Sequence, residues 1–514
     1  MISAYNLGAL FDPNLGGDNL ALIDCRDWDN PTEYTHREID DAANACARGL
    51  LARGLIKGDT VAILSANRAE FLISYLGILR AGMTAAPISY KFPGELVDFV
   101  LGDASVKHIF CDGARRNLFS ANLPVTDFDA ADDGGIESFD ALLDPGVFEA
   151  VRPGEKDVAM VLYTSGSSGR PKGVPLTQHG HLWALKGRMA NWPLNHHRLL
   201  IAAPLYHMNA LCTCLFGHAA STSTVLLPEF DARHYLEAIA RFKCTWVTSV
   251  PTMLAMAFME EDLLNSLDLS SVSIVRMGSA PVSPKLWSRV EEIFPGASVM
   301  NGYGTTEAGP MVFGATGGKP VPPMSVGRKV AEVDVKLIDK DGNEADEGVC
   351  WQRTPANTTG YLNLPEKSAE VITEDGWYDS GDVFRRDEDG NYYFVGRDDD
   401  MFVCGGENIY PAELERLLES HPDIAQAAVI SLDDEIKQQI PVAFVVAKPN
   451  TAPTPEGIKQ FALANGPAYQ HPRFVALLPE LPLAGTNKID RRKLLEHAVA
   501  NFKRRTPITK RTPP

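Results

Sequence analysis

The stretch Tyr163-Thr-Ser-Gly-Ser-Ser-Gly-Arg-Pro-Lys-Gly173 decides how this chain is interpreted, and it begins inside an apolar run, MVLYT, at 160–164. Its glycines let the backbone curl so that successive N–H groups point at one anion, and its hydroxyls add donors. Lys172 supplies a point charge suited to a phosphate. A flexible glycine/serine linker is the alternative, but a linker has no reason to follow a buried strand. The stretch is not a GxxxxGK loop, because Pro171 stands where that pattern needs glycine. It predicts a phosphate-binding loop of another fold.

Strands and helices alternate on both sides of this loop. Thr35 is a candidate helix N-cap, residues 61–64 (VAIL) form a short buried strand, a helix spans about 70–80, and 84–88 form the next strand. Repeated β–α alternation predicts an α/β fold with mostly parallel sheets covered by helices on both faces. The loop-rich run 122–153 is expected at the surface.

The pattern changes after about residue 339. Turns such as DKDGNE, TEDGWYDSGD and RRDEDGNYYF are hairpin signals, and they predict a small β-barrel-like part. After GRDDD (396–400) the sequence predicts a small α+β domain. Its expected elements are helix 411–420, strands 425–430 and 441–447, helix 455–464, strand 473–478 and helix 490–500. We therefore divide the chain into a large N-terminal domain (1–397), a small mobile domain (398–503) and a basic tail (504–514).

Composition narrows the class of protein. The 514 residues (56.0 kDa) carry a net charge of −18, which disfavours binding to nucleic acid or to an anionic membrane. Eight cysteines without a CxxC pair predict buried thiols in a reducing compartment rather than disulfides or zinc sites. The first residues lack the charge and apolar core of a signal peptide, and no apolar stretch is long enough to span a membrane. We expect a cytoplasmic protein. The composition is compatible with a homodimer.

Eight further motifs lie before and after this loop along the chain. They are RAGMTAAPIS (80–89), APLYHMNA (203–210), GSAP (278–281), NGYGTTE (301–307), WYDSGD (377–382), GRDDD, GGENIYPAELE (405–415) and NKIDRR (487–492). Together with the loop they resemble the adenylate-forming superfamily, and within it the acyl-CoA synthetases. The resemblance covers nearly the whole chain.

This resemblance implies a two-step reaction. A carboxylate oxygen attacks the α-phosphorus of ATP, giving an acyl-adenylate and pyrophosphate, and then the thiol of coenzyme A attacks the acyl carbon and expels AMP. The first step brings two anions together, so positive charge must stabilise its transition state.

The resemblance assigns roles to individual residues. Lys488 bridges the carboxylate and the α-phosphate, Glu307 holds Mg²⁺, Thr306 donates to phosphate, and His207 lies beside the carboxylate. Asn487 replaces the family's usual glycine before the lysine. The structural alternatives are a surface lysine for Lys488 and a core histidine for His207.

Nucleotide binding is expected from a larger set. Asp382 and Arg397 would hold the ribose and Tyr303 would stack on adenine, unless they are a turn aspartate and a buried structural tyrosine. The full set is Thr164, Ser165, Gly166, Ser167, Ser168, Gly169, Lys172, Gly278, Ser279, Ala280, Asn301, Gly302, Tyr303, Gly304, Thr305, Thr306, Asp382, Arg397 and Lys488.

Asp399 is implied as a hinge. Rotation about it would withdraw Lys488 and bring in Gly405, Gly406 and Glu407 to shape the CoA tunnel. A simple helix-entry turn before Pro411 also accounts for the glycines.

The acyl pocket is expected to be lined by small and apolar residues: His207, Met208, Asn209, Cys212, Pro251, Met277, Gly278, Gly302, Gly304 and Pro310. Such a pocket favours a benzoate- or hydroxycinnamate-like acid. A dicarboxylate would need an arginine, and none stands at these positions. Medium- or long-chain fatty acids, a carrier-protein phosphopantetheine as the thiol, and a non-catalytic nucleotide sensor are the alternatives.

Overall fold

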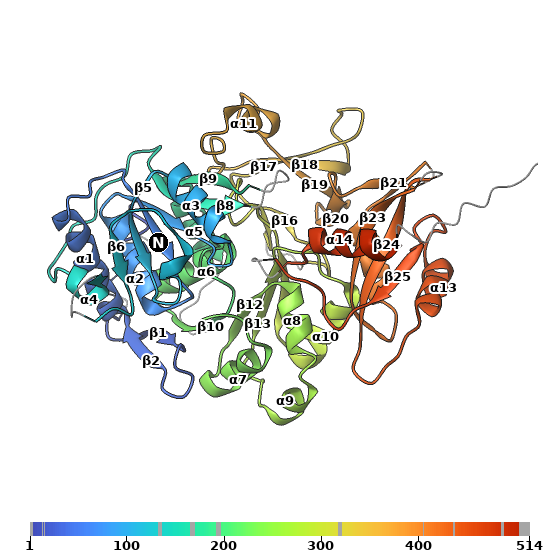
Figure 1. Ribbon diagram of the computed structural model, residues 1–514, viewed down its shortest axis with the longest axis horizontal. Helices are drawn as coiled ribbons and strands as arrows, with labels where there is room; N and C mark the ends of the chain where they lie inside the picture. The colour runs from blue at the N-terminus through green and yellow to red at the C-terminus, as the bar shows by residue number, and fades with distance from the viewer. Residues whose placement is uncertain are drawn as a thin grey trace, which may run out of the picture.

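The computed structural model describes residues 4–12, 14, 16–131, 136–164, 170–191, 197–316, 321–404, 406–434, 437–484 and 488–502. Two seven-stranded sheets form the N-terminal part, a smaller antiparallel sheet follows, and the C-terminal elements lie on the far side of that sheet from the N-terminus (Figure 1). This arrangement confirms the predicted fold class of a large α/β N-terminal part with a smaller C-terminal part.

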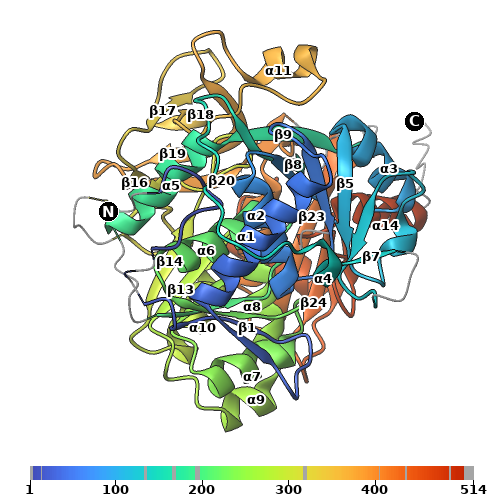
Figure 2. The same ribbon diagram turned by 90° about the vertical axis from the view of Figure 1, so that its left-hand side faces the viewer.

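The first sheet contains the strand that leads into the glycine-rich loop. Its strands are parallel except for the β8–β9 hairpin. In sheet order they are β7 (Glu137–Ser138), β6 (Val125–Asp127), β5 (Val106–Cys111), β3 (Thr60–Leu64), β4 (Thr84–Pro87), β8 (Val158–Thr164) and β9 (Lys172–Thr177). Helices and one short 3₁₀ turn belong to the same stretch of chain: α1 (His36–Ala52), α2 (Ala69–Arg80), α3 (Gly94–Asp103), η2 (Arg116–Leu118), α4 (Phe139–Leu142) and α5 (Gln178–Asn191). Figure 2 shows α1 and α2 side by side near the centre of the view.

Thr35 is the N-cap of α1, as predicted. Its side chain accepts from the backbone N–H of Glu38, and the Glu38 carboxylate accepts from the backbone of Thr35, so the pair forms a capping box.

The second sheet supplies the strand ends on which the cleft is built. It is parallel except at its β1–β2 edge. In sheet order the strands are β14 (Ser298–Gly302), β13 (Ile274–Gly278), β12 (Trp246–Ser249), β10 (Arg198–Ile201), β11 (Ser223–Leu226), β1 (Leu20–Asp24) and β2 (Thr32–Thr35). The accompanying helices are α6 (Met208–Ala219), α7 (Ala232–Phe242), α8 (Pro251–Ala257), α9 (Glu261–Ser266) and α10 (Pro284–Ile293).

The predicted hairpins form an open antiparallel sheet. Its strands are β17 (Asp334–Ile338), β18 (Glu347–Arg353), β19 (Tyr378–Arg386) and β20 (Tyr392–Arg397), with a separate pair β15 (Phe313–Gly314) and β16 (Arg328–Lys329), and helix α11 (Pro365–Val371) between β18 and β19. The outer strands β17 and β20 do not pair with each other, so within the described residues this part is a four-stranded sheet rather than a closed barrel.

The C-terminal elements follow the predicted order closely. They are β21 (Phe402–Cys404), β22 (Glu407–Ile409), α12 (Pro411–Glu419), β23 (Ile424–Asp434), β24 (Gln438–Ala447), α13 (Pro455–Asn465), β25 (Phe474–Leu477) and α14 (Arg491–Phe502). Their apolar residues form two clusters of their own, separate from the main core. The predicted tail, 504–514, lies outside the described residues.

The run 122–153 is not simply a surface loop, which corrects the prediction. It contributes β6, β7 and α4, and Phe128, Phe139 and Leu142 are buried. Phe128 stacks on Phe110 at 5.8 Å between ring centroids. The short strands add to the edge of the first sheet, where such packing outweighs the turn-rich composition.

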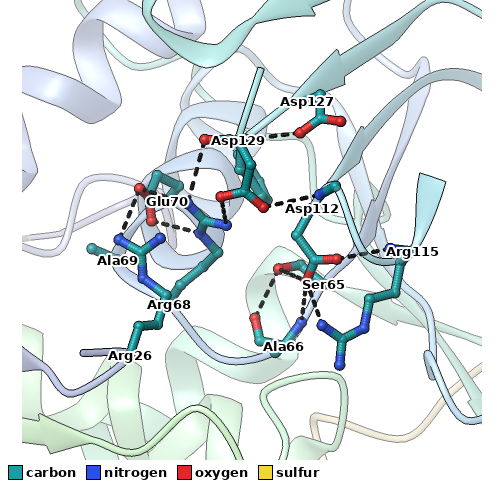
Figure 3. A network of polar contacts seen from close by, with 12 residues as sticks. Arg26, Ser65, Ala66, Arg68, Ala69, Glu70, Asp112, Arg115, Asp127 and Asp129 are labelled. Carbon is teal, nitrogen blue, oxygen red and sulfur yellow. Dashed lines mark hydrogen bonds and ion pairs between the residues drawn. The ribbon is translucent and has the colours of Figure 1, made fainter. Parts of the chain in front are cut away.

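A polar network crosses the ends of β3, β5 and β6 (Figure 3). Arg68, whose side chain is only 4% exposed, pairs with Glu70 and Asp129, each at 2.8 Å. Asp112 accepts hydrogen bonds from the Ser65 hydroxyl and from the backbone N–H of Ala66. The buried guanidinium is thus fully paired within the chain.

Candidate active site

One cleft of about 1910 Å³ brings together residues from both large sheets, the antiparallel sheet and the C-terminal part. Most sequence-predicted site residues line it: Thr164, Lys172, His207, Met208, Asn209, Cys212, Pro251, Ser279, Ala280, Asn301, Gly302, Tyr303, Gly304, Thr305, Thr306, Glu307, Pro310, Asp382, Arg397, Asp399 and Lys488. Residues 165–169 of the predicted phosphate loop lie outside the described residues.

Parallel strand ends build one wall of the cleft. β13 and β14 pair in register from Ile274/Ser298 to Gly278/Gly302, so they end at the same edge. The loops that follow carry Ser279 and Ala280 from β13, and the segment 303–307 from β14. This edge of an α/β sheet is where ligands usually bind.

The end of the cleft near the predicted phosphate loop gathers a hydroxyl, a cation and a carboxylate. The Thr164 hydroxyl oxygen is buried and has no hydrogen-bond partner among the described residues. The Tyr361 hydroxyl donates to Glu307 Oε1 at 3.0 Å, and Lys172 Nζ lies 4.1 Å from the centre of the Tyr361 ring. Burial lowers the pKa of Lys172, and the Glu307 carboxylate opposes that change. An unpaired hydroxyl beside a cation suits an incoming anion.

Asp382 is engaged at both carboxylate oxygens. Oδ1 accepts from Arg397 Nη1 at 3.1 Å, and Oδ2 accepts from the Tyr303 hydroxyl. Burial raises the pKa of Asp382, and the neighbouring Arg397 charge opposes this. The Tyr303 ring packs edge-on against Phe384 at 4.8 Å. A ribose bound here would share or replace these partners.

Lys488 enters the cleft from the C-terminal part. Its surface is exposed within the cleft, but the surrounding protein walls partly desolvate its ammonium group and lower its pKa. The carboxylates of Asp382 and Glu307 oppose this effect, and the Arg397 charge adds to it. Lys488 therefore lines the same cleft as Asp382 and Glu307, the residues predicted for the ribose and for Mg²⁺.

Of the residues predicted for the hinge and for the CoA tunnel, only the hinge residue Asp399 borders the cleft. Asp399 accepts from Arg397 Nε at 2.6 Å and from Nη2 at 2.9 Å. Gly406 has a left-handed φ of +94°, a side chain added there would meet no atom within 4 Å, and Glu407 begins β22. Neither Gly406 nor Glu407 borders the cleft, and Gly405 lies outside the described residues.

The predicted acyl pocket needs two corrections. Met277 is fully buried in the main core and does not line the cleft, and Gly278 is packed against the carbonyl of Gly302 instead. Successive side chains on a strand point to opposite faces, so Arg276, next to Met277, faces the cleft.

The expectation that no arginine lines the pocket is also wrong. Arg276 on β13 and Arg188 on α5 both border the cleft. The signals were present in the sequence. Arg276 interrupts an otherwise apolar strand, SIVRMG, and Arg188 continues the helical stripe of His181, Ala184 and Leu185, all three of which are buried.

The described residues contain no group of three or more acidic, histidine or cysteine side chains that could hold a metal ion by themselves. The cleft does contain the buried carboxylate of Glu307 and, among its other lining groups, the unpaired hydroxyl of Thr164. That donor set fits Mg²⁺ held mainly by phosphate oxygens and one carboxylate. No described helix is both long and apolar enough to cross a bilayer.

Sequence comparison now defines the class. Residues 14–362 match the AMP-binding enzyme model and residues 413–488 match the AMP-binding enzyme C-terminal domain model. The chain belongs to the AMP-binding enzyme family.

Relatives narrow the class to the CoA ligases. The chain is 30% identical to an oxalate–CoA ligase of Arabidopsis thaliana, covering 90% of this chain and 93% of the relative. It is 32% identical to a feruloyl-CoA synthase of Amycolatopsis, covering 89% and 92%. The structure of the anthranilate CoA ligase AuaEII with anthranoyl-AMP superposes with a TM-score of 0.85 at 26% identity, covering 96% and 97%. The chain is an AMP-forming acid–CoA ligase, and ATP and CoA are its substrates.

Proposed function

We propose that the cleft first joins a carboxylic acid to AMP. A carboxylate oxygen of the acid attacks the α-phosphorus of ATP, and pyrophosphate leaves with the electrons of the broken P–O bond. Lys488 offsets the repulsion between the two anions and stabilises the charge of the transition state. The observation that supports this most is the entry of Lys488 into the cleft that Glu307 and Asp382 also line.

The remaining residues hold the nucleotide. Thr164, Lys172 and Thr306 contact phosphate oxygens, Asp382 and Arg397 hold the ribose, and Tyr303 borders the base. Glu307 would hold Mg²⁺, which would neutralise phosphate charge when bound. His207, at the start of α6, borders the reacting carboxylate.

The second step requires the thiol in place of the lysine. We propose that residues 398–503 rotate about Asp399, so that Lys488 leaves and Gly405, Gly406 and Glu407 approach the cleft. The thiol sulfur then attacks the acyl carbon, and AMP leaves. The position of Gly406 and Glu407 away from the cleft, while Lys488 is inside it, supports this division of labour.

The acid is proposed to be aromatic, of the benzoate or hydroxycinnamate type. The names of the relatives, feruloyl-CoA synthase and anthranilate CoA ligase, support this class. Apolar lining at Met208, Pro251 and Pro310 is compatible with an aromatic ring.

The test is acid-dependent exchange of labelled pyrophosphate into ATP, followed by assay of AMP and acyl-CoA formation. Benzoates, hydroxycinnamates and fatty acids of several lengths are compared. We expect exchange with aromatic acids and much less with fatty acids. Absence of exchange with every acid would refute the adenylation step, and a preference for fatty acids would refute the aromatic class.

The hinge has its own test. In Asp399→Pro the backbone at the hinge is restrained, so we expect adenylate formation to persist while acyl-CoA formation falls at least about tenfold. Asp399→Ala is the matched control, because it removes the same carboxylate, which accepts from Arg397, and leaves the backbone unrestrained. An Asp399→Pro variant that retains the full thiol step would contradict rotation at this residue.

A further inference from the structure

Two arginines at the floor of the cleft have no carboxylate partner. The ion pairs of the described residues include neither Arg188 nor Arg276, although both guanidinium groups are enclosed by protein. Arg188 and Arg276 are half-buried, whereas the fully buried Arg68 and Arg80 pair with Glu70 and Asp129 and with Asp40 respectively. The chain therefore supplies carboxylates to Arg68 and Arg80 but none to the two half-buried arginines of the cleft.

The contacts of Arg276 are neutral. Its Nη1 donates to the Asn209 side-chain oxygen at 2.5 Å and approaches the Thr248 hydroxyl at 3.5 Å. A Cβ at Gly302 would lie 2.7 Å from Nη2, so the glycine leaves the space that this guanidinium occupies. These contacts orient the group without neutralising its charge.

Arg188 is held by rings. Its guanidinium carbon lies 4.4 Å from the centre of the Phe216 ring and 5.6 Å from that of Trp246, and its Nη2 is buried with no hydrogen-bond partner among the described residues. Burial lowers the pKa of Arg188 to about 9, and the nearby Arg276 charge acts in the same direction. Leaving one such charge unpaired is costly, and two close together cost more.

The position of the pair separates it from the reacting centre. Both arginines also border an inner cavity of about 100 Å³ lined mostly by apolar side chains, among them Leu185 and Leu215. Lys488, His207 and Glu307 line the main cleft but not this inner cavity. A group bound between the arginines would thus lie deeper than the carboxylate that reacts.

We propose that Arg188 and Arg276 bind a second carboxylate on the substrate acid, so that the enzyme activates one end of a dicarboxylic acid. This inference rests on the proposed function and adds its substrate class. Each guanidinium fork matches a carboxylate with paired N–H donors, and the substrate supplies the counter-charge that the chain lacks. The apolar side chains around the inner cavity are compatible with an aromatic ring between the two carboxylates.

The test compares acids of matched size. Wild-type enzyme is assayed with isophthalate, terephthalate and 4-carboxycinnamate, and with the monomethyl ester of each. Losing a buried charge pair typically costs at least about 2 kcal/mol, so we expect kcat/KM to favour the best diacid over its ester by about 30-fold or more. Comparable or higher turnover of the ester would overturn the inference.

Variants assign the preference to the arginines. Arg276→Met and Arg188→Met should lower kcat/KM for the diacid while leaving that for the ester unchanged or higher, and Arg276→Lys should retain part of the preference. The control is Arg289→Met, because Arg289 borders the same cleft but already pairs with Glu292 at 2.7 Å. Equal loss for diacid and ester would assign the arginines a structural role and overturn the inference.

The wild-type comparison decides the inference even if a variant fails to fold. Binding of isophthalate and of its monomethyl ester is also measured by calorimetry without ATP. If only acids without a second carboxylate were turned over, the dicarboxylate inference would be refuted and the ligase reaction would stand. Absence of pyrophosphate exchange with every acid would instead refute the proposed function, and the calorimetry would then decide the arginine pair by itself.

Discussion

The network at the ends of β3, β5 and β6 and the floor of the cleft both withdraw arginine from solvent, fully at Arg68 and partly at Arg188 and Arg276, but they differ in which groups face the guanidinium. In the network, Arg68 has two carboxylates at 2.8 Å (Figure 3). At the floor, Arg188 and Arg276 meet rings, an amide and a hydroxyl. The charge of Arg68 is neutralised by carboxylates of the chain itself, whereas Arg188 and Arg276 are available to bind an anionic ligand.

This contrast separates residues that stabilise the fold from residues that bind a ligand. Removing a charge that the fold has paired leaves its carboxylates unsatisfied. Removing a charge that awaits a ligand relieves the empty protein and harms only the complex. The cleft also holds Lys488, a cation without a close carboxylate partner among the described residues, so it should behave like the floor arginines and not like Arg68.

The largest effect is expected for Lys488→Ala. Adenylate formation should fall by about 10²–10³-fold or more, because the transition state loses its main neutralising charge. Formation of acyl-CoA from preformed adenylate should persist near the wild-type rate, and the thermal midpoint should barely change. Pyrophosphate exchange, single-turnover thioester assays and melting curves measure the three quantities.

Lys493→Ala in the same C-terminal part is the control, because that lysine is exposed and does not border the cleft. Equal loss of both half-reactions in Lys488→Ala would show that the lysine has another role.

The opposite behaviour is expected for Arg68→Met. Breaking this pairing costs roughly 3 kcal/mol of unfolding free energy, because Asp129 loses its arginine partner and Glu70 keeps only Arg26, at 3.2 Å. Urea unfolding measures the loss, and the ratio of kcat/KM values between substrates should not move. Arg233→Met, which breaks an exposed pairing with Glu260 and Asp262, should cost about 0–1 kcal/mol. Similar losses in the two variants would contradict the distinction between a paired buried arginine and an exposed one.

The smallest effect is expected for Tyr361→Phe. The variant removes the hydroxyl that donates to Glu307 but keeps the ring beneath Lys172. One lost hydrogen bond is worth about 1 kcal/mol, so KM for ATP with Mg²⁺ should rise about fivefold while kcat is retained. Tyr361→Leu, which also removes the ring, should raise KM further. An unchanged KM in both would remove Tyr361 from the nucleotide site.

Much of the fold was predictable because its signals are local. The threonine cap at position 35, the apolar strand 61–64 and the prolines that open α12 and α13 mark their elements without reference to the rest of the chain. The run 122–153 was not predictable in the same way, because its short strands depend on an existing sheet edge.

The residues of the site can likewise be divided into those that a local motif predicts and those that depend on tertiary packing. The residues that line the nucleotide end of the cleft follow motifs that can be read along the chain. The floor depends on side-chain direction: a shift of one residue on β13 exchanges Met277, in the core, for Arg276, in the cleft. Arg188 belongs to a recognisable helical stripe, but its guanidinium reaches the floor only through tertiary contacts with the rings of Phe216 on α6 and Trp246 on β12.

The missing side chain at position 302 has a consequence for altering this enzyme. A methyl group there would collide with the guanidinium from the neighbouring strand, so the two positions are coupled sterically. Redesign toward acids with a single carboxylate should therefore begin with a shorter side chain at residue 276. A larger residue can then replace the glycine at 302 and narrow the floor of the cleft. Enlarging residue 302 first would displace the arginine without removing its charge.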